Sequence, residues 1–209
     1  MAILSPTMTR RIRHADPADL DGLIALISEA NKTYRQWAGS DWAPPDDGHE
    51  RQHWDEQITN SDSWAAVAVE EGRLVGCIDF MPAEIAAPNL AHLSRLFVTP
   101  NIWRSGIGSE LCLKAIGEMR QRGFDRAELF APVANSGARA FYERHGWKPT
   151  AQTRKRHGLQ LLRYTLRIPS AASNESPAEA GPLLSQQQGN CDGAGAPSFH
   201  LCRSRNIRT

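Results

Sequence analysis

The chain has 209 residues, of which 41% are hydrophobic and 22% are charged, and its formal net charge is +1. This balance argues against a general polyanion-binding surface, so we expect no nucleic acid as a partner. No apolar run approaches the roughly 18 residues of a membrane helix, and the first residues lack the pattern of a signal peptide. We therefore expect a cytoplasmic protein that does not contact membranes. The four cysteines, without a C-x-x-C pair, fit a reducing compartment and indicate no metal site.

The composition changes after Ile168. Residues 169–209 are dominated by Ser, Ala, Gly, Pro, Gln and Asn. Such a segment buries too little apolar surface to offset its ordering entropy, which predicts a disordered tail. A tail that recruits a partner is the alternative. We also expect residues 1–9 to be disordered, with Met8 as an alternative start, and a single domain over 10–168.

The first half of this domain is predicted to begin with a short strand at 11–13 and a helix. Asp16 is a favoured N-cap, and Pro17 suits the first helical position. Apolar residues then recur at helical spacing from 20 to 27. Residues 34–54 predict a long loop or broken helix, followed by a short helix at 54–58. Apolar alternation predicts a hairpin of strands at 64–70 and 74–81.

The second half continues with alternating elements. We expect a strand at 90–98, a helix at 106–122, a strand at 126–131, a helix at 136–145 and a strand at 161–166. The basic segment 154–158 is predicted to be an exposed hairpin tip, with phosphate contact as the alternative. Strands joined by crossover helices indicate an α/β (α+β) domain with a mixed sheet flanked by helices.

The segment 98–109 contains the strongest local motif. A strand ends, a turn follows, and Gly106 and Gly108 open a helix. Free main-chain N–H groups and the helix dipole favour an anion at such a position. No Lys-Ser/Thr pair follows, and a third glycine is missing, so a P-loop and a dinucleotide fingerprint are excluded. A plain tight turn is the alternative.

A second motif, Asn-Ser-Gly-Ala-Arg-Ala-Phe-Tyr-Glu-Arg-His-Gly-Trp, occupies residues 135–147. Ala138 and Phe141 are three residues apart and are expected to pack inward together. Tyr142 then points about 100° around the helix, toward the edge of a cleft. Its phenol is suited to protonating a leaving group. The alternative is a surface tyrosine on an amphipathic helix.

The order of these motifs resembles the GCN5-related N-acetyltransferase superfamily, over about residues 10–168. The resemblance implies the acyl-CoA N-acyltransferase fold, with a mostly antiparallel sheet splayed between its fourth and fifth strands. It implies acetyl-CoA as co-substrate, no metal, and direct transfer of acetyl to a primary amine of a small molecule or protein in a ternary complex. Homodimers are frequent in this superfamily, so a homodimer is also expected.

The resemblance also implies roles for particular residues. Main-chain amides of 104–109 hold the pyrophosphate, Val98 faces the thioester or pantetheine, Asn135 binds the pantetheine arm, and Tyr142 protonates the thiolate. Trp103 and Arg104 depart from the usual Gln or Arg followed by Gly, but main-chain amides still supply the phosphate contacts. The full expected cofactor set is Leu96, Phe97, Val98, Trp103, Arg104, Ser105, Gly106, Ile107, Gly108, Ser109, Asn135, Ala138, Phe141 and Tyr142.

The general base is expected on the strand 90–98. Histone acetyltransferases of the superfamily carry a catalytic Glu at the place that His92 occupies here. Strand alternation predicts that His92, Ser94, Leu96 and Val98 share one face. An imidazole is suited to removing a proton from an ammonium group. A structural histidine with a water chain as the base is the alternative, and Glu84 and Glu128 are weaker candidates.

Residues 34–56 are expected to cover the acceptor. Tyr34, Trp37 and Trp42 are the candidate substrate-binding residues, because aromatic rings beside carboxylates receive cationic amines. The alternative is a solvated acidic loop whose aromatic side chains pack on the core. The competing function is a catalytically silent sensor or scaffold that binds acyl-CoA, motivated by Trp103, Arg104 and the missing Glu base.

Overall fold

A computed structural model describes residues 10–40, 42–83 and 89–169. The segments 1–9 and 170–209, for which we predict disorder, lie outside the described residues, as do Asp41 and Glu84. The strands are β1 (Arg10–His14), β2 (Trp64–Glu70), β3 (Arg73–Pro82), β4 (Leu90–Val98), β5 (Arg126–Pro132), β6 (Lys148–Arg156) and β7 (Leu159–Arg167). The α-helices are α1 (Leu20–Lys32), α2 (Asp47–Thr59), α3 (Ile107–Gln121) and α4 (Ser136–Arg144).

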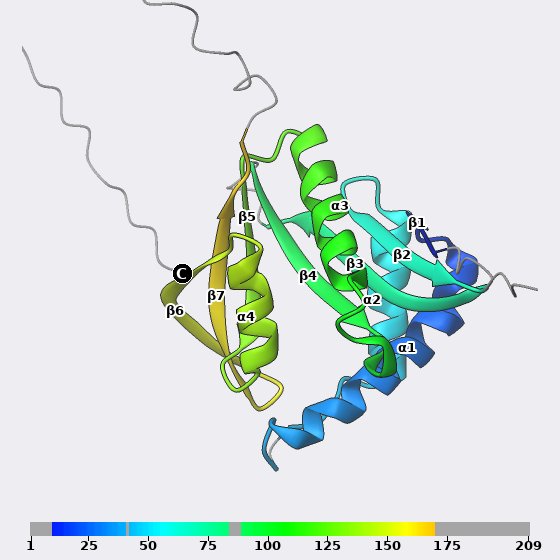
Figure 1. Cartoon of the computed structure of the whole chain (residues 1–209), viewed down its shortest axis with the longest axis horizontal. Helices are drawn as coiled ribbons and strands as arrows, with labels where there is room; N and C mark the ends of the chain where they lie inside the picture. The colour runs from blue at the N-terminus through cyan, green and yellow to red at the C-terminus, as the bar shows by residue number, and fades with distance from the viewer. Residues whose placement is uncertain (1–9, 41, 84–88, 170–209) are drawn as a thin grey trace, which may run out of the picture. The chain divides into compact units, whose positions relative to one another are not determined.

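The described strands form one sheet in the order β1-β2-β3-β4-β5-β7-β6 (Figure 1). Every neighbouring pair is antiparallel except β4 and β5, which are parallel. This confirms the predicted mixed, mostly antiparallel sheet. No helix among the described residues is both long and apolar enough to cross a lipid bilayer.

Two elements differ from the expectation. β6 was not predicted, because it is an edge strand exposed along almost its whole length and carries no apolar alternation. Helix α2 begins at Asp47 rather than at residue 54. The Asp46 carboxylate accepts a hydrogen bond from the His49 amide at 2.8 Å and so caps this helix, most of which is polar. The exposed turn that joins β6 to β7 lies at 157–158, within the predicted hairpin tip.

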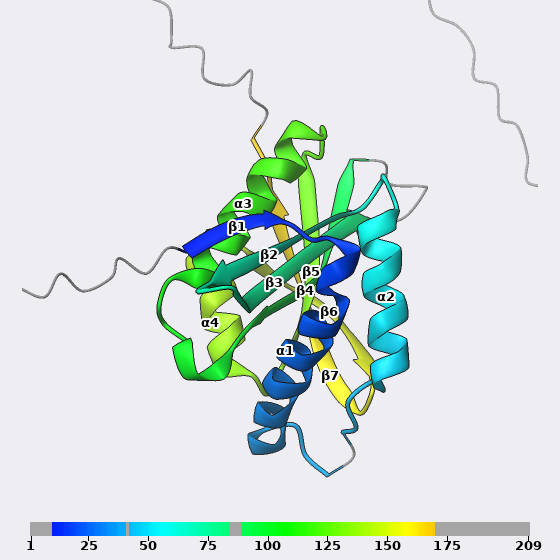
Figure 2. The same ribbon diagram turned by 90° about the vertical axis from the view of Figure 1, so that its right-hand side faces the viewer.

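Helices cover both faces of the sheet. Helices α1 and α2 lie on one face, and α3 and α4 lie on the other (Figure 2). Strand β2 shows the consequence, because Ala65 and Val67 pack with α1 while Ala66 and Ala68 pack on the α3 side. Its apolar side chains are therefore buried on both faces, as in sheets covered by two helical layers.

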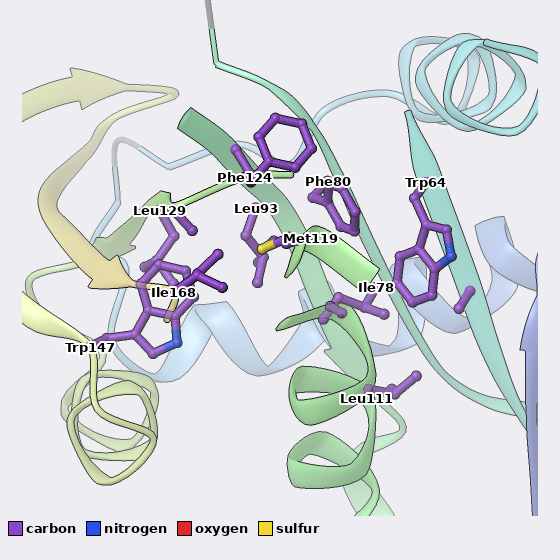
Figure 3. Packing of buried hydrophobic residues seen from close by; sticks show 14 of the residues in the cluster. Trp64, Ile78, Phe80, Leu93, Leu111, Met119, Phe124, Leu129, Trp147 and Ile168 are labelled. Carbon is purple, nitrogen blue, oxygen red and sulfur yellow. The ribbon is translucent and has the colours of Figure 1, made fainter. Parts of the chain in front are cut away.

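The larger core lies between the sheet and α3, where Leu111 and Met119 meet side chains of the central strands (Figure 3). Gly76 on β3 allows a close approach of this helix. A Cβ at Gly76 would lie 2.9 Å from Leu111 Cδ1 and 3.0 Å from Ile107 Cγ2, which is too close for either carbon. The first turn of α3 is therefore held tightly against the sheet.

Strands β4 and β5 separate after three residue pairs. They are paired only at Leu90–Arg126, Ala91–Ala127 and His92–Glu128, although β4 continues to Val98. Figure 1 shows the two strands close at one end and diverging toward the other. This confirms the predicted splay and leaves one backbone edge of β4 without a strand partner on that side.

Candidate active site

The loop between β4 and α3 presents uncapped main-chain donors. Arg104 and Gly106 both have left-handed backbone conformations, with φ of 68° and 91°. Gly106 is the N-cap of α3, and no side chain caps the helix there. The N–H groups of residues 107–109 therefore have no intrahelical acceptor, and the positive end of the dipole of a 15-residue helix lies with them. This geometry suits a phosphate group, as the sequence predicts.

Arg10 braces this loop and was not predicted from the sequence. Its guanidinium donates to the Ser105 carbonyl at 3.3 Å and to the Glu110 carboxylate at 3.1 Å, and it also pairs with Glu70. Because Glu110 lies in the first turn of α3, its unpaired charge would repel an anion at the helix start. Arg10 offsets that charge, but the residues are about a hundred positions apart, so local patterns carry no signal of the contact.

Trp103 is 52% exposed and belongs to the same loop. Its indole N–H donates to the Val98 carbonyl at 2.8 Å. The tryptophan thus links the start of the loop to the end of β4, and one acceptor position of the Val98 carbonyl is occupied. This contact gives Trp103 a loop-bracing role beside its predicted place in the cofactor site.

The cofactor residues predicted on β4, α3 and α4 converge at Gly108. A Cβ at Gly108 would lie 3.4 Å from the Phe141 ring and 3.8 Å from a Val98 methyl group. Asn135 caps the start of α4, since its side-chain oxygen accepts from the Ala138 amide at 2.9 Å. The structure therefore brings α4 against the segment 98–108, about thirty positions earlier in the chain.

Tyr142 packs against the core and is not the surface residue of the alternative hypothesis. Its ring lies 6.1 Å from Trp147 and 6.3 Å from Tyr164, measured between ring centroids. Within the described residues, the hydroxyl has no hydrogen-bond partner. Burial raises the pKa of Tyr142, and the nearby Cys112 and Tyr34 groups raise it further. The phenol therefore holds its proton at neutral pH and has a free donor.

A pocket of about 380 Å³ opens on the α2 side of the sheet. It is bounded by α2, the ends of β3 and β4, β5 and the β6–β7 hairpin, and its lining residues are His49, Gln52, His53, Glu56, Met81, His92, Leu93, Ser94, Arg95, Phe130, Arg154, Arg156 and Leu161. His92 lies where β4 and β5 begin to separate. The predicted base therefore lines a pocket large enough for a small molecule.

His92 is oriented by Glu128. Its Nδ1 lies 3.4 Å from Glu128 Oε1, and Arg163 binds the other carboxylate oxygen at 2.7 Å. The contact with His92 lowers the pKa of Glu128, and Arg163 lowers it further, so the carboxylate stays ionised. An ionised carboxylate favours the tautomer with a proton on Nδ1, which leaves Nε2 as an acceptor. Glu128 is thus better placed to orient His92 than to act as the base itself.

A β-bulge at Ser94 changes which side chains of β4 point to each face of the sheet. Asp79 pairs with Arg95 and Phe80 pairs with Leu93, so Ser94 has no partner on β3. The prediction that His92, Ser94, Leu96 and Val98 share one face is therefore wrong. His92 and Ser94 line the pocket on the α2 side, whereas Leu96 and Val98 pack on the α3 side, because the extra residue inverts the alternation.

The three predicted acceptor residues form one aromatic cluster. Tyr34 lies 4.4 Å from Trp37 and 5.0 Å from Trp42, between ring centroids. Burial, followed by the charge of Glu50, raises the pKa of Tyr34 to about 12. Glu50 itself is 5% exposed and forms two hydrogen bonds with Arg95, at 2.9 and 3.1 Å. The carboxylate whose charge acts on Tyr34 is therefore already paired with Arg95.

Replacing Arg95 with Met is expected to lower the free energy of unfolding by about 3 kcal/mol, because it leaves the buried Glu50 charge without a partner. Adding Glu50→Gln to that variant is expected to restore most of the loss. Urea unfolding of both variants measures the difference. A single Arg95→Met variant as stable as the wild type would show that the pair does not hold α2 to β4.

The comparisons with known proteins agree with this geometry. The model of the acetyltransferase (GNAT) family matches residues 25–147, which is more than half of the chain. The chain belongs to this family. An uncharacterized N-acetyltransferase of Methanocaldococcus jannaschii is 27% identical over 153 residues, covering 71% of this chain and 65% of that protein. The chain thus spans less than two thirds of that relative's length.

Two further N-acetyltransferases are similar to the chain. The aminoalkylphosphonate N-acetyltransferase of Salmonella typhimurium is 30% identical over 139 residues, covering 66% of this chain and 84% of that enzyme. The crystal structure of PaiA N-acetyltransferase from Thermoplasma acidophilum in complex with coenzyme A matches with a TM-score of 0.58 and 22% identity, over 75% of this chain and 98% of that one. The second likeness concerns the fold alone. In the described part of this GNAT protein, no three His, Cys, Asp or Glu side chains gather into a candidate metal site.

Proposed function

We propose that this GNAT protein transfers the acetyl group of acetyl-CoA to a primary amine within a ternary complex. The observation that carries the proposal is the convergence of the uncapped start of α3 with Phe141 and Val98 at Gly108, on the α3 side of the separating strands. Membership of the acetyltransferase family supports acetyl-CoA as the donor. Similarity to N-acetyltransferases supports transfer to nitrogen.

The residues divide the chemistry between the two sides of the sheet. The N–H groups of 107–109 bind the diphosphate of the donor. On the other side, His92 Nε2 accepts a proton from the ammonium, directly or through water. The free amine attacks the thioester carbonyl, and a main-chain donor near Val98 stabilises the oxyanion. The C–S bond then breaks, and Tyr142 gives its proton to the departing sulfur. The proton that remains on the attacking nitrogen passes through water to the Tyr142 phenolate, which leaves a neutral amide, CoA thiol and a restored tyrosine.

The buried cysteines support direct attack by the amine. Burial raises the pKa of Cys112 to about 11, and it raises the pKa of the fully buried Cys77 as well. A thiol that stays protonated and inaccessible is a poor nucleophile. An acyl-enzyme on either cysteine is therefore disfavoured.

The proposal is tested by measuring thiol release from acetyl-CoA with a panel of primary amines, alongside calorimetric titration with CoA. Turnover with at least one amine is expected. No affinity for CoA would overturn the assignment of the donor site. Binding of CoA without turnover on any amine, in the wild type and in Tyr142→Phe alike, would instead favour the sensor.

Replacing His92 with Gln is expected to lower the rate of transfer about 100-fold at neutral pH. His49→Gln, in the same pocket but without a carboxylate partner, serves as the control and should keep the rate of the wild type. A His92→Gln variant that retains the wild-type rate would exclude His92 as the base.

A further inference from the structure

The pocket beside His92 has walls of opposite charge. Arg154 and Arg156 line it from β6, and Glu56 lines it from α2. The Glu56 carboxylate accepts a hydrogen bond from Gln52 at 2.9 Å and has no cationic partner within the described residues. The pocket therefore offers one carboxylate on the helical wall and two guanidinium groups on the wall formed by the strand.

The other charged groups of the pocket are already paired. Arg95 binds Glu50, as described above. His53 Nε2 lies 3.1 Å from the carboxylate of Asp79, which is fully buried. These pairs leave Arg154, Arg156 and Glu56 as the charges open to a ligand.

Arg154 and Arg156 are arranged as an anion-binding pair. Residues two apart on a strand project from the same face, so both guanidinium groups lie on the pocket side of β6. No carboxylate within the described ranges lies within 4.0 Å of either group. Burial lowers the pKa of Arg154, and the charge of Arg156 lowers it further, while the charge of Glu128 raises it in part. Guanidinium groups bind carboxylates and phosphates in bidentate geometry.

The contacts of the Phe130 ring limit the length of a ligand that reaches both Arg154 and His92. The Arg154 guanidinium carbon lies 3.6 Å from the centroid of this ring, and the His92 ring centroid lies 6.1 Å from it. The anion-binding group and the predicted base thus lie against one side chain. A molecule that reaches both has its amine and its acidic group only a few bonds apart.

We propose that the acceptor is a small zwitterion in which a primary amine lies a few bonds from a carboxylate, phosphonate or phosphate that Arg154 and Arg156 hold. Its ammonium faces Glu56 and His92 before deprotonation. This inference rests on the proposed function, and it moves acceptor recognition from the aromatic cluster at Tyr34 to the β6 wall.

The kinetic test compares β-alanine and 2-aminoethylphosphonate with propylamine, which lacks an acidic group, using acetyl-CoA as donor. The wild type is expected to favour the zwitterions. Arg154→Gln should raise KM for them about 10- to 100-fold, the loss expected for a charge-assisted hydrogen bond, and leave KM for propylamine unchanged. Lys155→Gln makes the same charge change on the opposite face of β6. It should change neither the KM for the zwitterions nor the KM for propylamine. Equal use of propylamine and the zwitterions, or equal effects of the two substitutions, would overturn the inference.

A binding measurement separates this inference from the proposed reaction. Methylphosphonate and acetate, which carry no amine, are titrated into the wild type, Arg154→Gln and Lys155→Gln and followed by NMR. Shifts at the pocket that weaken only in Arg154→Gln support the anion site, even where no amine turns over and the proposed function fails. Equal shifts in all three proteins, or none, overturn the anion site and leave the acetyl-transfer proposal standing on its own assay. The stronger of the two probes shows whether a carboxylate or a phosphonate is preferred.

Discussion

Replacing Tyr142 with Phe is expected to lower the rate of acetyl transfer by about 10²–10⁴-fold, while the affinity for CoA changes little. The substitution removes only the hydroxyl, which has no hydrogen-bond partner within the described residues and whose pKa is raised by burial. Without this donor, the thiolate must leave unprotonated. Steady-state kinetics and calorimetry on the same samples separate the two effects.

Tyr164→Phe is the matched control for this prediction. The Tyr164 hydroxyl accepts a hydrogen bond from Arg139 at 3.2 Å and donates one to Glu143 at 3.0 Å, so its loss should lower stability. It should leave the transfer rate near that of the wild type. A Tyr142→Phe enzyme that retains the wild-type rate would remove the acid role from this residue, and water would then have to protonate the leaving group.

Replacing Gly108 with Asp is expected to weaken CoA binding roughly 100-fold or more. The new carboxylate would lie in the first turn of α3, where the donor's diphosphate is expected. Two like charges about 4 Å apart repel by about 4 kcal/mol at an effective dielectric constant of 20. An acidic residue at a helix N-terminus interacts favourably with the helix dipole, and a melting temperature near that of the wild type would show that the weaker binding does not come from unfolding.

Two further variants separate charge from size at Gly108. Gly108→Ala adds a Cβ at ordinary contact distance, 3.4 Å from Phe141, and should bind CoA nearly as well as the wild type. Gly108→Asn has the size of Asp without its charge, so its affinity for CoA should lie between those of the Ala and Asp variants. If Asn and Asp weaken binding equally, the effect is steric. If neither weakens it, the diphosphate lies elsewhere.

The elements that carry the proposed donor site were predictable because their motifs are local. The glycines at 106 and 108 follow a strand and open a helix within one short segment, and the helix 136–144 carries its own cap and its tyrosine. The structure of each motif is determined by residues that are close together in the sequence. The folded structure adds the contact of the two motifs at Gly108.

The acceptor side was harder to predict because distant residues build it. The hydrogen bonds from Arg95 to Glu50 and the contact of His92 with Glu128 join residues at least 36 positions apart, and no spacing rule connects them. The bulge at Ser94 has no glycine or other compositional signal, yet it inverts the faces of the strand. Strand β6 supplies Arg154, but an exposed edge strand lacks the apolar alternation by which strands are recognised.

The limited pairing of β4 with β5 has a mechanical consequence. Three residue pairs join β1–β4 to β5–β7 across the middle of the sheet. The core that α3 shares with both parts also connects them, and a donor that contacts both α3 and α4 adds a further connection. Because a ligand that binds only the folded state raises its stability, the melting temperature should increase with CoA concentration. Amide hydrogen exchange in the paired residues of β4 and β5 should slow as the CoA concentration rises. This exchange rate measures donor occupancy without knowledge of the acceptor.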